Sequence, residues 1–288
     1  MKRLLITDLD NTLYDWVTYF ARSLRAMVDE LALLLDVNKE QLLDEIQANN
    51  RQLGTVEQPF SVFELPSVRK KFGAATPQEL KAALDSALHA FNSERRRSLY
   101  LYAGVSETLE RISEAGVVVV GHTEASLANA YYRLLRLGVV PFVRRLYVLE
   151  SPPVLHPEPV RQAELQPPPG LVVEVPRAER KPNPVLLLDI CRREGVDPND
   201  SIYVGDSRTK DMFMARQAGV TAAWAKYGTV YDSEDWATVV RITNWTADDV
   251  IAEAELRDAA SGTSPDLVLG SFQELLPVFG LEESREKS

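Results

Sequence analysis

A short apolar segment that ends in two aspartates is the feature that most limits how this chain can fold. Residues 2–7 have the pattern of a short buried strand, with apolar residues bounded by charge. Asp8 and Asp10 follow at once, and residues two apart on an extended backbone point to the same side. In an open α/β sheet, ligands bind at the carboxyl ends of the strands. We therefore expect the two carboxylates to lie at a ligand-binding edge of a sheet.

Two neighbouring carboxylates repel each other unless one is protonated or a cation lies nearby. The pair thus indicates metal binding, proton-transfer chemistry or both. A simple turn after a strand would have the same composition, because Asp and Asn are common in turns. The remainder of the chain has to decide between these interpretations.

Further polar residues follow predicted strands or precede a predicted helix later in the chain. They are, in chain order, Thr123 after the strand 117–120, Lys181 before the helix 185–193, and Gly205, Asp206 and Asp211 after the strand 201–204.

This order resembles the four motifs of the haloacid dehalogenase-like hydrolase superfamily. The first motif is Asp8-Leu9-Asp10-Asn11-Thr12, the second is Thr123, the third is Lys181, and the fourth runs from Gly205-Asp206 to Asp211. The resemblance covers residues 1–14 and 101–281. Each motif alone is common, but all four in order at strand ends are highly specific.

The resemblance implies a phosphohydrolase that cleaves a small phosphomonoester through an aspartyl-phosphate intermediate. Asp8 would be the nucleophile, and Asp10 the general acid and then the general base. Relatives that hydrolyse carbon–halogen bonds place no acidic residue at the second position, so Asp10 favours phosphoryl transfer. Thr123 would donate its hydroxyl to the phosphoryl oxygens, and Lys181 would hold both Asp8 and the phosphate.

The same resemblance implies Mg²⁺ as the cofactor. Its protein ligands would be Asp8, Asp206 and the backbone carbonyl of Asp10, since Mg²⁺ prefers oxygen ligands. Asp211 would orient the motif lysine or the waters on the metal. Glu124 directly follows the second motif, where relatives often have a small or amide residue. A carboxylate there would repel a phosphate unless it points to solvent or pairs with a cation.

The pattern of apolar residues divides the chain into a core and an insertion. Residues 15–100 carry helical patterns without a strand, which predicts an α-helical cap domain inserted into a catalytic core of residues 1–14 and 101–288. Strands and helices alternate from residue 101 onward, which predicts an α/β fold with a doubly wound parallel sheet. The proline-rich residues 151–178 are expected to form an extended excursion with a short strand at 171–175. Residues 229–264 are expected to form a second insertion, with a helix near 247–256.

The resemblance further implies that the cap closes over the active site and selects the substrate. Arg69, Lys70 and Arg95–Arg97 are the cap residues that we consider for contact with an anionic substrate, although for the three arginines a solvated helix end is the preferred interpretation. His122 is expected to point away from Thr123 along the strand.

The bulk composition limits the class of partner. The formal net charge of −10 argues against nonspecific binding to nucleic acid or to an anionic membrane. A single cysteine, Cys191, allows no internal disulfide and fits a reducing, cytoplasmic location. We expect a small phosphorylated metabolite as the partner. A phosphomutase of the same superfamily, or a non-catalytic binding or regulatory protein on the same scaffold, remain alternatives.

Overall fold

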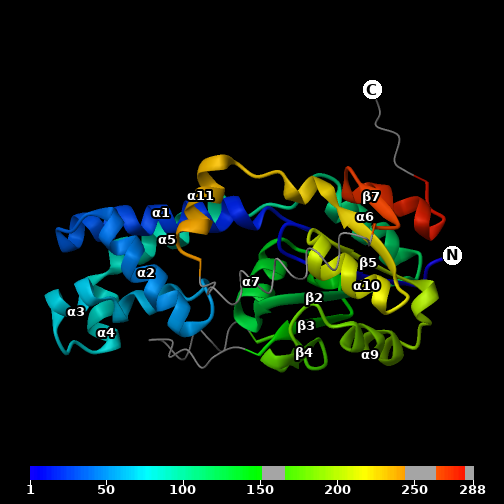
Figure 1. Cartoon of the computed structure of the whole chain (residues 1–288), viewed down its shortest axis with the longest axis horizontal. Coiled ribbons are helices and arrows are strands. Elements are labelled where there is room, and N and C mark those ends of the chain that lie inside the picture. The colour runs from blue at the N-terminus through cyan, green and yellow to red at the C-terminus, as the bar shows by residue number, and fades with distance from the viewer. Residues whose placement is uncertain (151–165, 244–263, 283–288) are drawn as a thin grey trace.

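The computed structural model describes residues 1–150, 166–243 and 264–282, which form an α/β core and a helical cap (Figure 1). All strands of the described sheet are parallel, in the order β4-β3-β2-β1-β5-β6-β7. The predicted parallel α/β fold is therefore confirmed. The strands are β1 (Leu4–Thr7), β2 (Val118–Ser126), β3 (Arg145–Leu149), β4 (Val172–Val175), β5 (Ser201–Gly205), β6 (Thr221–Ala225) and β7 (Leu267–Leu269).

The position of β1 in the centre of the sheet brings the sequence motifs together. β1 lies between β2 and β5, and its last residue, Thr7, pairs in register with Gly121 of β2 and Val204 of β5. The residues that follow Thr7 and Val204, together with the end of β2, therefore lie at one edge of the sheet. The backbone N–H of Asp8 continues this register by donating to the carbonyl of Val204 at 2.9 Å.

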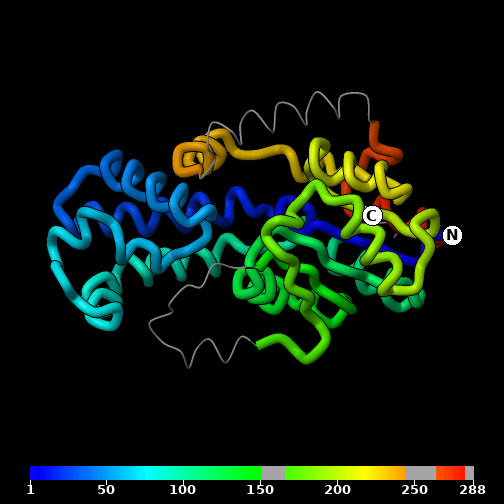
Figure 2. The backbone as a smooth tube through the Cα atoms, turned by 60° about the horizontal axis from the view of Figure 1, so that its bottom comes forward, coloured from blue at the N-terminus to red at the C-terminus, as the bar shows by residue number. Residues whose placement is uncertain are grey.

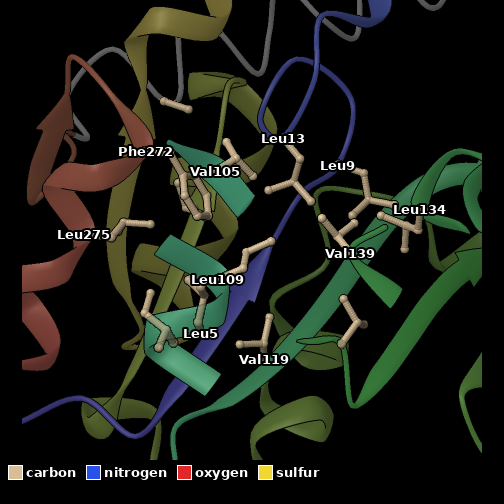
Figure 3. Packing of buried hydrophobic residues seen from close by; sticks show 14 of the residues in the cluster. Leu5, Leu9, Leu13, Val105, Leu109, Val119, Leu134, Val139, Phe272 and Leu275 are labelled. Atoms are coloured by element: carbon tan, nitrogen blue, oxygen red, sulfur yellow. The ribbon is translucent and has the colours of Figure 1, made fainter. Parts of the chain in front are cut away.

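Apolar residues of β1 alternate between two buried layers, as a strand covered on both faces requires. Leu5 packs in the layer with Leu109 and Phe272 (Figure 3), whereas Leu4 and Ile6 pack in the opposite layer. Burying one such side chain contributes about 1.5–3 kcal/mol. The first layer is covered by α6 (Val105–Glu114), α7 (Leu127–Arg136) and the 3₁₀ helix η7 (Phe272–Phe279), and the second by α9 (Pro184–Glu194) and α10 (Phe213–Gln217).

The helical cap has its own hydrophobic core and lies at one end of the molecule (Figure 2). Asn38 caps the second cap helix as the sequence predicts, because its side chain accepts from the backbone N–H of Gln41 at 2.7 Å. The cap contains α1 (Trp16–Leu35), α2 (Lys39–Leu53), the 3₁₀ helix η1 (Pro59–Glu64), α3 (Pro66–Phe72), α4 (Pro77–Ala83) and α5 (Asp85–Arg97).

Helix α11 (Ser233–Arg241) comes from the second insertion and packs beside α1 of the cap (Figures 1 and 2). Asp235 on α11 is buried and forms ion pairs with Arg22 and Arg25 of α1. Ile242, just after α11, is buried within the hydrophobic core of the cap, and its carbonyl accepts from the side chain of Asn50 at 2.9 Å. The part of the chain that builds the cap region thus includes a segment distant in sequence from residues 15–100.

Several predicted elements differ in detail from those observed. The sequence pattern predicts one helix from Thr76 toward residues 91–97, but the structure divides this segment at Leu84 into α4 and α5. The pattern also predicts a strand over 142–149, but β3 begins only at Arg145, since a 3₁₀ helix that contains Pro141 occupies Val140–Phe142. The short strand expected at 171–175 is present as β4, at the edge of the sheet. The helix expected near 247–256 and most of the proline-rich stretch lie outside the described residues.

Among the helices that the structure describes, no segment has the length and apolar character needed to cross a membrane.

Candidate active site

A buried lysine joins the first and fourth motifs at the edge of the sheet. The Nζ atom of Lys181 lies 2.9 Å from Oδ1 of Asp8 and 3.0 Å from Oδ1 of Asp211. All three side chains are buried. Burial alone would lower the pKa of Lys181, but Asp211 and Asp8 outweigh it and raise that pKa well above its ordinary value. The lysine therefore carries a fixed positive charge next to the expected nucleophile.

Asp211 is held by three donors, which leaves it little capacity for another ligand. Its Oδ1 accepts from Lys181 and from the hydroxyl of Tyr203 at 3.2 Å, and its Oδ2 accepts from the backbone N–H of Ser207 at 3.1 Å. A side chain at Gly205 would overlap this carboxylate, which explains the glycine before Asp206. This geometry supports Asp211 as a residue that orients Lys181.

His122 lies beside Tyr203 in the polar surroundings of the site. It is buried, as is Thr123, and its Nδ1 lies 3.4 Å from the hydroxyl of Tyr203. Burial, with a contribution from Lys181, lowers its pKa well below the ordinary value, so the ring is neutral. His122 therefore takes part in the polar network behind Lys181, through Tyr203.

Asp206 lies at the end of β5 among polar groups from three other segments. Its carboxylate accepts from Asn11 at 3.5 Å and from the hydroxyl of Tyr231 at 3.4 Å, and its backbone carbonyl accepts from the indole of Trp224 at 2.9 Å. Burial, together with repulsion from Asp211, raises the pKa of Asp206 to about 7. Few hydrogen-bond donors lie close enough to offset the negative charge of this carboxylate. We expect such a carboxylate to bind a cation.

The donor set at this edge fits a hard cation such as Mg²⁺. Oxygens of Asp8, Asp206 and Asp211 lie within 4.8 Å of one another. Burial raises the pKa of Asp8 well above its ordinary value, because Lys181 opposes this effect only in part. A cation would relieve the repulsion. Asp8 and Asp206 are the two of these three carboxylates that can still bind a cation, since both oxygens of Asp211 already have partners.

Asp10 directs its carboxylate away from this cluster. Its Oδ1 accepts from the hydroxyl of Tyr14 at 2.6 Å and lies 3.5 Å from Nη1 of Arg133, a buried residue of α7. Burial raises the pKa of Asp10, while Arg133 opposes the rise. A carboxyl group whose pKa is raised toward neutrality is suited to donate and accept protons. The prediction that its backbone carbonyl binds the metal stays a prediction.

Thr123 lies within β2, which continues to Ser126 and not, as predicted, only to residue 120; it is two residues past Gly121, the partner of the last residue of β1. Glu124, the departure from the family pattern, follows it. The Oγ1 of Thr123 accepts from the backbone N–H of Ala125 at 3.0 Å, which leaves the hydroxyl proton available to a ligand. Glu124 pairs with Lys210 at 2.9 Å. The positive charge of Lys210 therefore compensates the carboxylate that would otherwise repel a phosphate.

The cap residues that we considered for substrate contact have other partners, apart from Lys70, which is exposed. Arg69 pairs with Glu64 at 2.6 Å, and Arg97 pairs with Glu94 at 2.9 Å on the surface. Arg95 stacks over Tyr132 of α7, with its guanidinium carbon 4.1 Å from the ring centroid. The surface pairs favour the interpretation of a solvated helix end, whereas Arg95 contacts the core.

Sequence reasoning missed several residues that contact the site. These are Tyr14, Tyr203, Tyr231, Arg133, Lys210 and Glu57 of the cap. Arg133 lies on the amphipathic helix α7, and no sequence motif marks it as a residue that contacts the site.

Comparisons with known proteins identify the family of this chain. The model of the haloacid dehalogenase-like hydrolase family matches residues 2–219, and a second HAD-hydrolase-like model matches residues 178–275. A glyceraldehyde 3-phosphate phosphatase of Methanopyrus kandleri is 27% identical over 238 residues, which cover 81% of this chain and 88% of that protein. A phosphoglycolate phosphatase of Salmonella typhi is 32% identical over 105 residues, which cover 36% of this chain and 31% of that protein.

The fold has close counterparts among solved structures. A 2-haloacid dehalogenase from Pseudomonas syringae pv. Tomato DC3000 superposes with a TM-score of 0.54 at 21% identity, covering 97% of this chain and 98% of that one. At this identity the likeness concerns the fold alone. The four motifs, their convergence at one sheet edge and the match over residues 2–219 show that the chain belongs to the haloacid dehalogenase-like hydrolase family.

Proposed function

We propose that this chain is a Mg²⁺-dependent phosphatase that hydrolyses a small phosphomonoester. The observation that carries the proposal is the contact of Lys181 with Asp8. Asp8 also lies close to Asp206, and Asp10 follows it two residues later in the chain. The names of the sequence relatives, which are phosphatases of small phosphorylated metabolites, support the same substrate class.

The first half of the reaction would form a phosphoenzyme on Asp8. An oxygen of Asp8 attacks phosphorus, and the bond from phosphorus to the ester oxygen breaks. Asp10 gives a proton to that departing oxygen, so the product leaves as a neutral alcohol. Lys181 and the hydroxyl of Thr123 stabilise the negative charge of the transferring group.

The second half would release phosphate. Asp10, now deprotonated, takes a proton from a water molecule, whose oxygen attacks phosphorus and regenerates the carboxylate of Asp8. Mg²⁺, held by Asp8 and Asp206, would supply positive charge that lets an anionic ester approach an anionic nucleophile. Asp211 keeps Lys181 in place throughout.

Phosphate release tests the proposal directly. The purified chain would be assayed with D-glyceraldehyde 3-phosphate, phosphoglycolate and p-nitrophenyl phosphate in the presence of Mg²⁺. We expect turnover that EDTA abolishes and Mg²⁺ restores, with Ca²⁺ a poor substitute because it prefers longer bonds and more ligands. Asp8→Asn should abolish turnover, whereas Asp189→Asn, a change at a partly exposed residue of α9 that pairs with Arg192, should leave it unchanged.

The proposal is wrong if wild-type protein releases no phosphate from any ester of a broader set of phosphorylated metabolites, or if full activity persists after exhaustive chelation. Transfer of phosphate to a sugar in place of water would identify a phosphomutase.

A further inference from the structure

A buried ionic cluster connects the cap to Asp10. Arg133 of α7 is 1% exposed and points its guanidinium at Glu57, which lies in the cap between α2 and η1. Its Nη1 lies 2.5 Å from Oε1 of Glu57, and its Nη2 lies 3.1 Å from Oε2. The same Nη1 lies 3.5 Å from Oδ1 of Asp10. One guanidinium nitrogen thus faces two carboxylates, one from the cap and one from the core.

Glu57 is fixed in this position by groups on both sides of the cap boundary. The indole of Trp16, at the start of α1, donates to its Oε1. Asn129, one turn before Arg133 on α7, donates to its backbone carbonyl at 3.0 Å. Two residues on one face of a core helix therefore hold the same cap residue. The position of Glu57 depends directly on how the cap sits on the core.

The two carboxylates compete for Arg133, and in this structure Glu57 holds it. Glu57 accepts hydrogen bonds from both Nη1 and Nη2 of Arg133. Asp10 has only the longer contact with Nη1, and its short hydrogen bond comes from the hydroxyl of Tyr14. In the described part of the chain, the carboxylates that pair with Arg133 are those of Glu57 and Asp10. If Arg133 lost Glu57, Asp10 would remain as its carboxylate partner. Leaving a buried charge unpaired is strongly unfavourable, so Arg133 would then close onto Asp10.

We propose that Glu57 of the cap releases Asp10 from Arg133 when the cap is seated. With Glu57 in place, the guanidinium is occupied; the contacts of Asp10 with Tyr14 and Arg133 are both on Oδ1, which leaves Oδ2 to face the leaving oxygen. When the cap lifts, Arg133 forms its paired hydrogen bonds with Asp10 and withdraws it. Glu57 and Arg133 are thus positioning residues that link acid–base catalysis to cap closure. The inference rests on the proposed function, because it takes Asp10 as the general acid and base.

Glu57→Gln is the variant that isolates this effect. It keeps the size of the side chain and the backbone contact with Asn129, but it removes the charge that holds Arg133. We expect kcat/KM for D-glyceraldehyde 3-phosphate to fall at least about tenfold, as for partial loss of general acid catalysis. The value for p-nitrophenyl phosphate should fall less, since nitrophenolate leaves without needing a proton. A purely structural contact would lower both values alike.

Matched variants complete the test. Glu64→Gln removes a different cap carboxylate, which pairs with Arg69 at the surface, and should change neither value. Glu57→Asp keeps the charge and should retain more activity than Glu57→Gln. Adding Arg133→Met to Glu57→Gln removes the group that captures Asp10, so kcat should recover above that of the single variant.

Three results would overturn the inference while leaving the proposed function intact. They are an active wild type whose Glu57→Gln variant is unimpaired, an equal loss on both esters, or a folded double variant that is no faster than Glu57→Gln. If the double variant does not fold, as its thermal melt would show, the comparison of the two esters in Glu57→Gln decides. A wild type that releases no phosphate from either ester and from the broader set would refute the proposed function itself.

Discussion

The buried carboxylates of the site lack a full set of positive partners, so without metal their contribution to stability should fall as pH rises. Asp206 shows this most clearly. Burial and the neighbouring Asp211 raise its pKa from 3.8 to about 7 in the folded chain. A carboxyl whose pKa is raised on folding binds more protons when folded than when unfolded. Its contribution is therefore fully present below pH 3.8 and is lost as pH rises to about 7.

The size of the effect follows from the difference between the two pKa values. The difference is about three pH units, and each unit corresponds to about 1.36 kcal/mol, so Asp206 alone contributes a loss of about 4 kcal/mol. The pKa of Asp8 is also raised, so this residue acts in the same direction. Mg²⁺ binds the ionised carboxylates and should oppose the loss. At one hundred times its Kd, the metal would restore about 2.7 kcal/mol.

Urea denaturation at pH 5 and pH 8, with EDTA or with Mg²⁺, measures the part of this effect that develops above pH 5, which is about two pH units or about 2.7 kcal/mol. In EDTA, raising the pH from 5 to 8 should lower the free energy of unfolding of the wild type relative to that of Asp206→Asn, in which buried His122 contributes equally. Asp206→Asn should be more stable than the wild type at pH 8 and should gain nothing from Mg²⁺. Asp189→Asn, the same exchange at a partly exposed residue outside the site, should behave like the wild type.

A metal-free wild type whose stability changes with pH in the same way as that of Asp206→Asn would refute this reasoning, since buried His122, whose pKa is lowered, acts in the opposite direction in both proteins. So would an Asp206→Asn variant that is less stable than the wild type in EDTA at pH 8. Either result would mean that the carboxylates are well compensated without a metal.

Two further predictions concern the residues around Asp8. Asp10→Asn should slow turnover by about 10²–10⁴-fold but still allow some phosphoenzyme to form, because the nucleophile remains. Acid-quenched incorporation of labelled phosphate measures the phosphoenzyme. Label on a residue other than Asp8 would contradict the prediction. Lys181→Met should lower the free energy of unfolding by about 3–5 kcal/mol at pH 8 in EDTA, since it leaves Asp8 and Asp211 buried without their cation. Because the pKa of Asp8 is raised, protonation removes part of this unpaired charge at lower pH. The loss measured in urea should therefore be smaller at pH 5, and a loss that is independent of pH would count against the assignment.

The sequence by itself determined the family, the fold class and the segments that meet at the site. These features are local: an apolar run followed by Asp8 and Asp10, or a glycine followed by Asp206, can be recognised without knowing the neighbours. The chain order of strands and helices then predicts a parallel sheet, because parallel neighbours require crossover connections. The confirmed predictions are those that depend on patterns of this kind.

Only the tertiary structure decided which side chains control the motif residues. Arg133 is ten residues beyond Thr123 and 76 residues beyond Glu57, and nothing in either segment signals that they pair. The same holds for α11, whose buried Asp235 finds its partners on α1 more than two hundred residues earlier in the chain. Contacts between distant segments depend on the packing of whole helices, and the periodicity of one helix shows which face is buried but not what it is buried against.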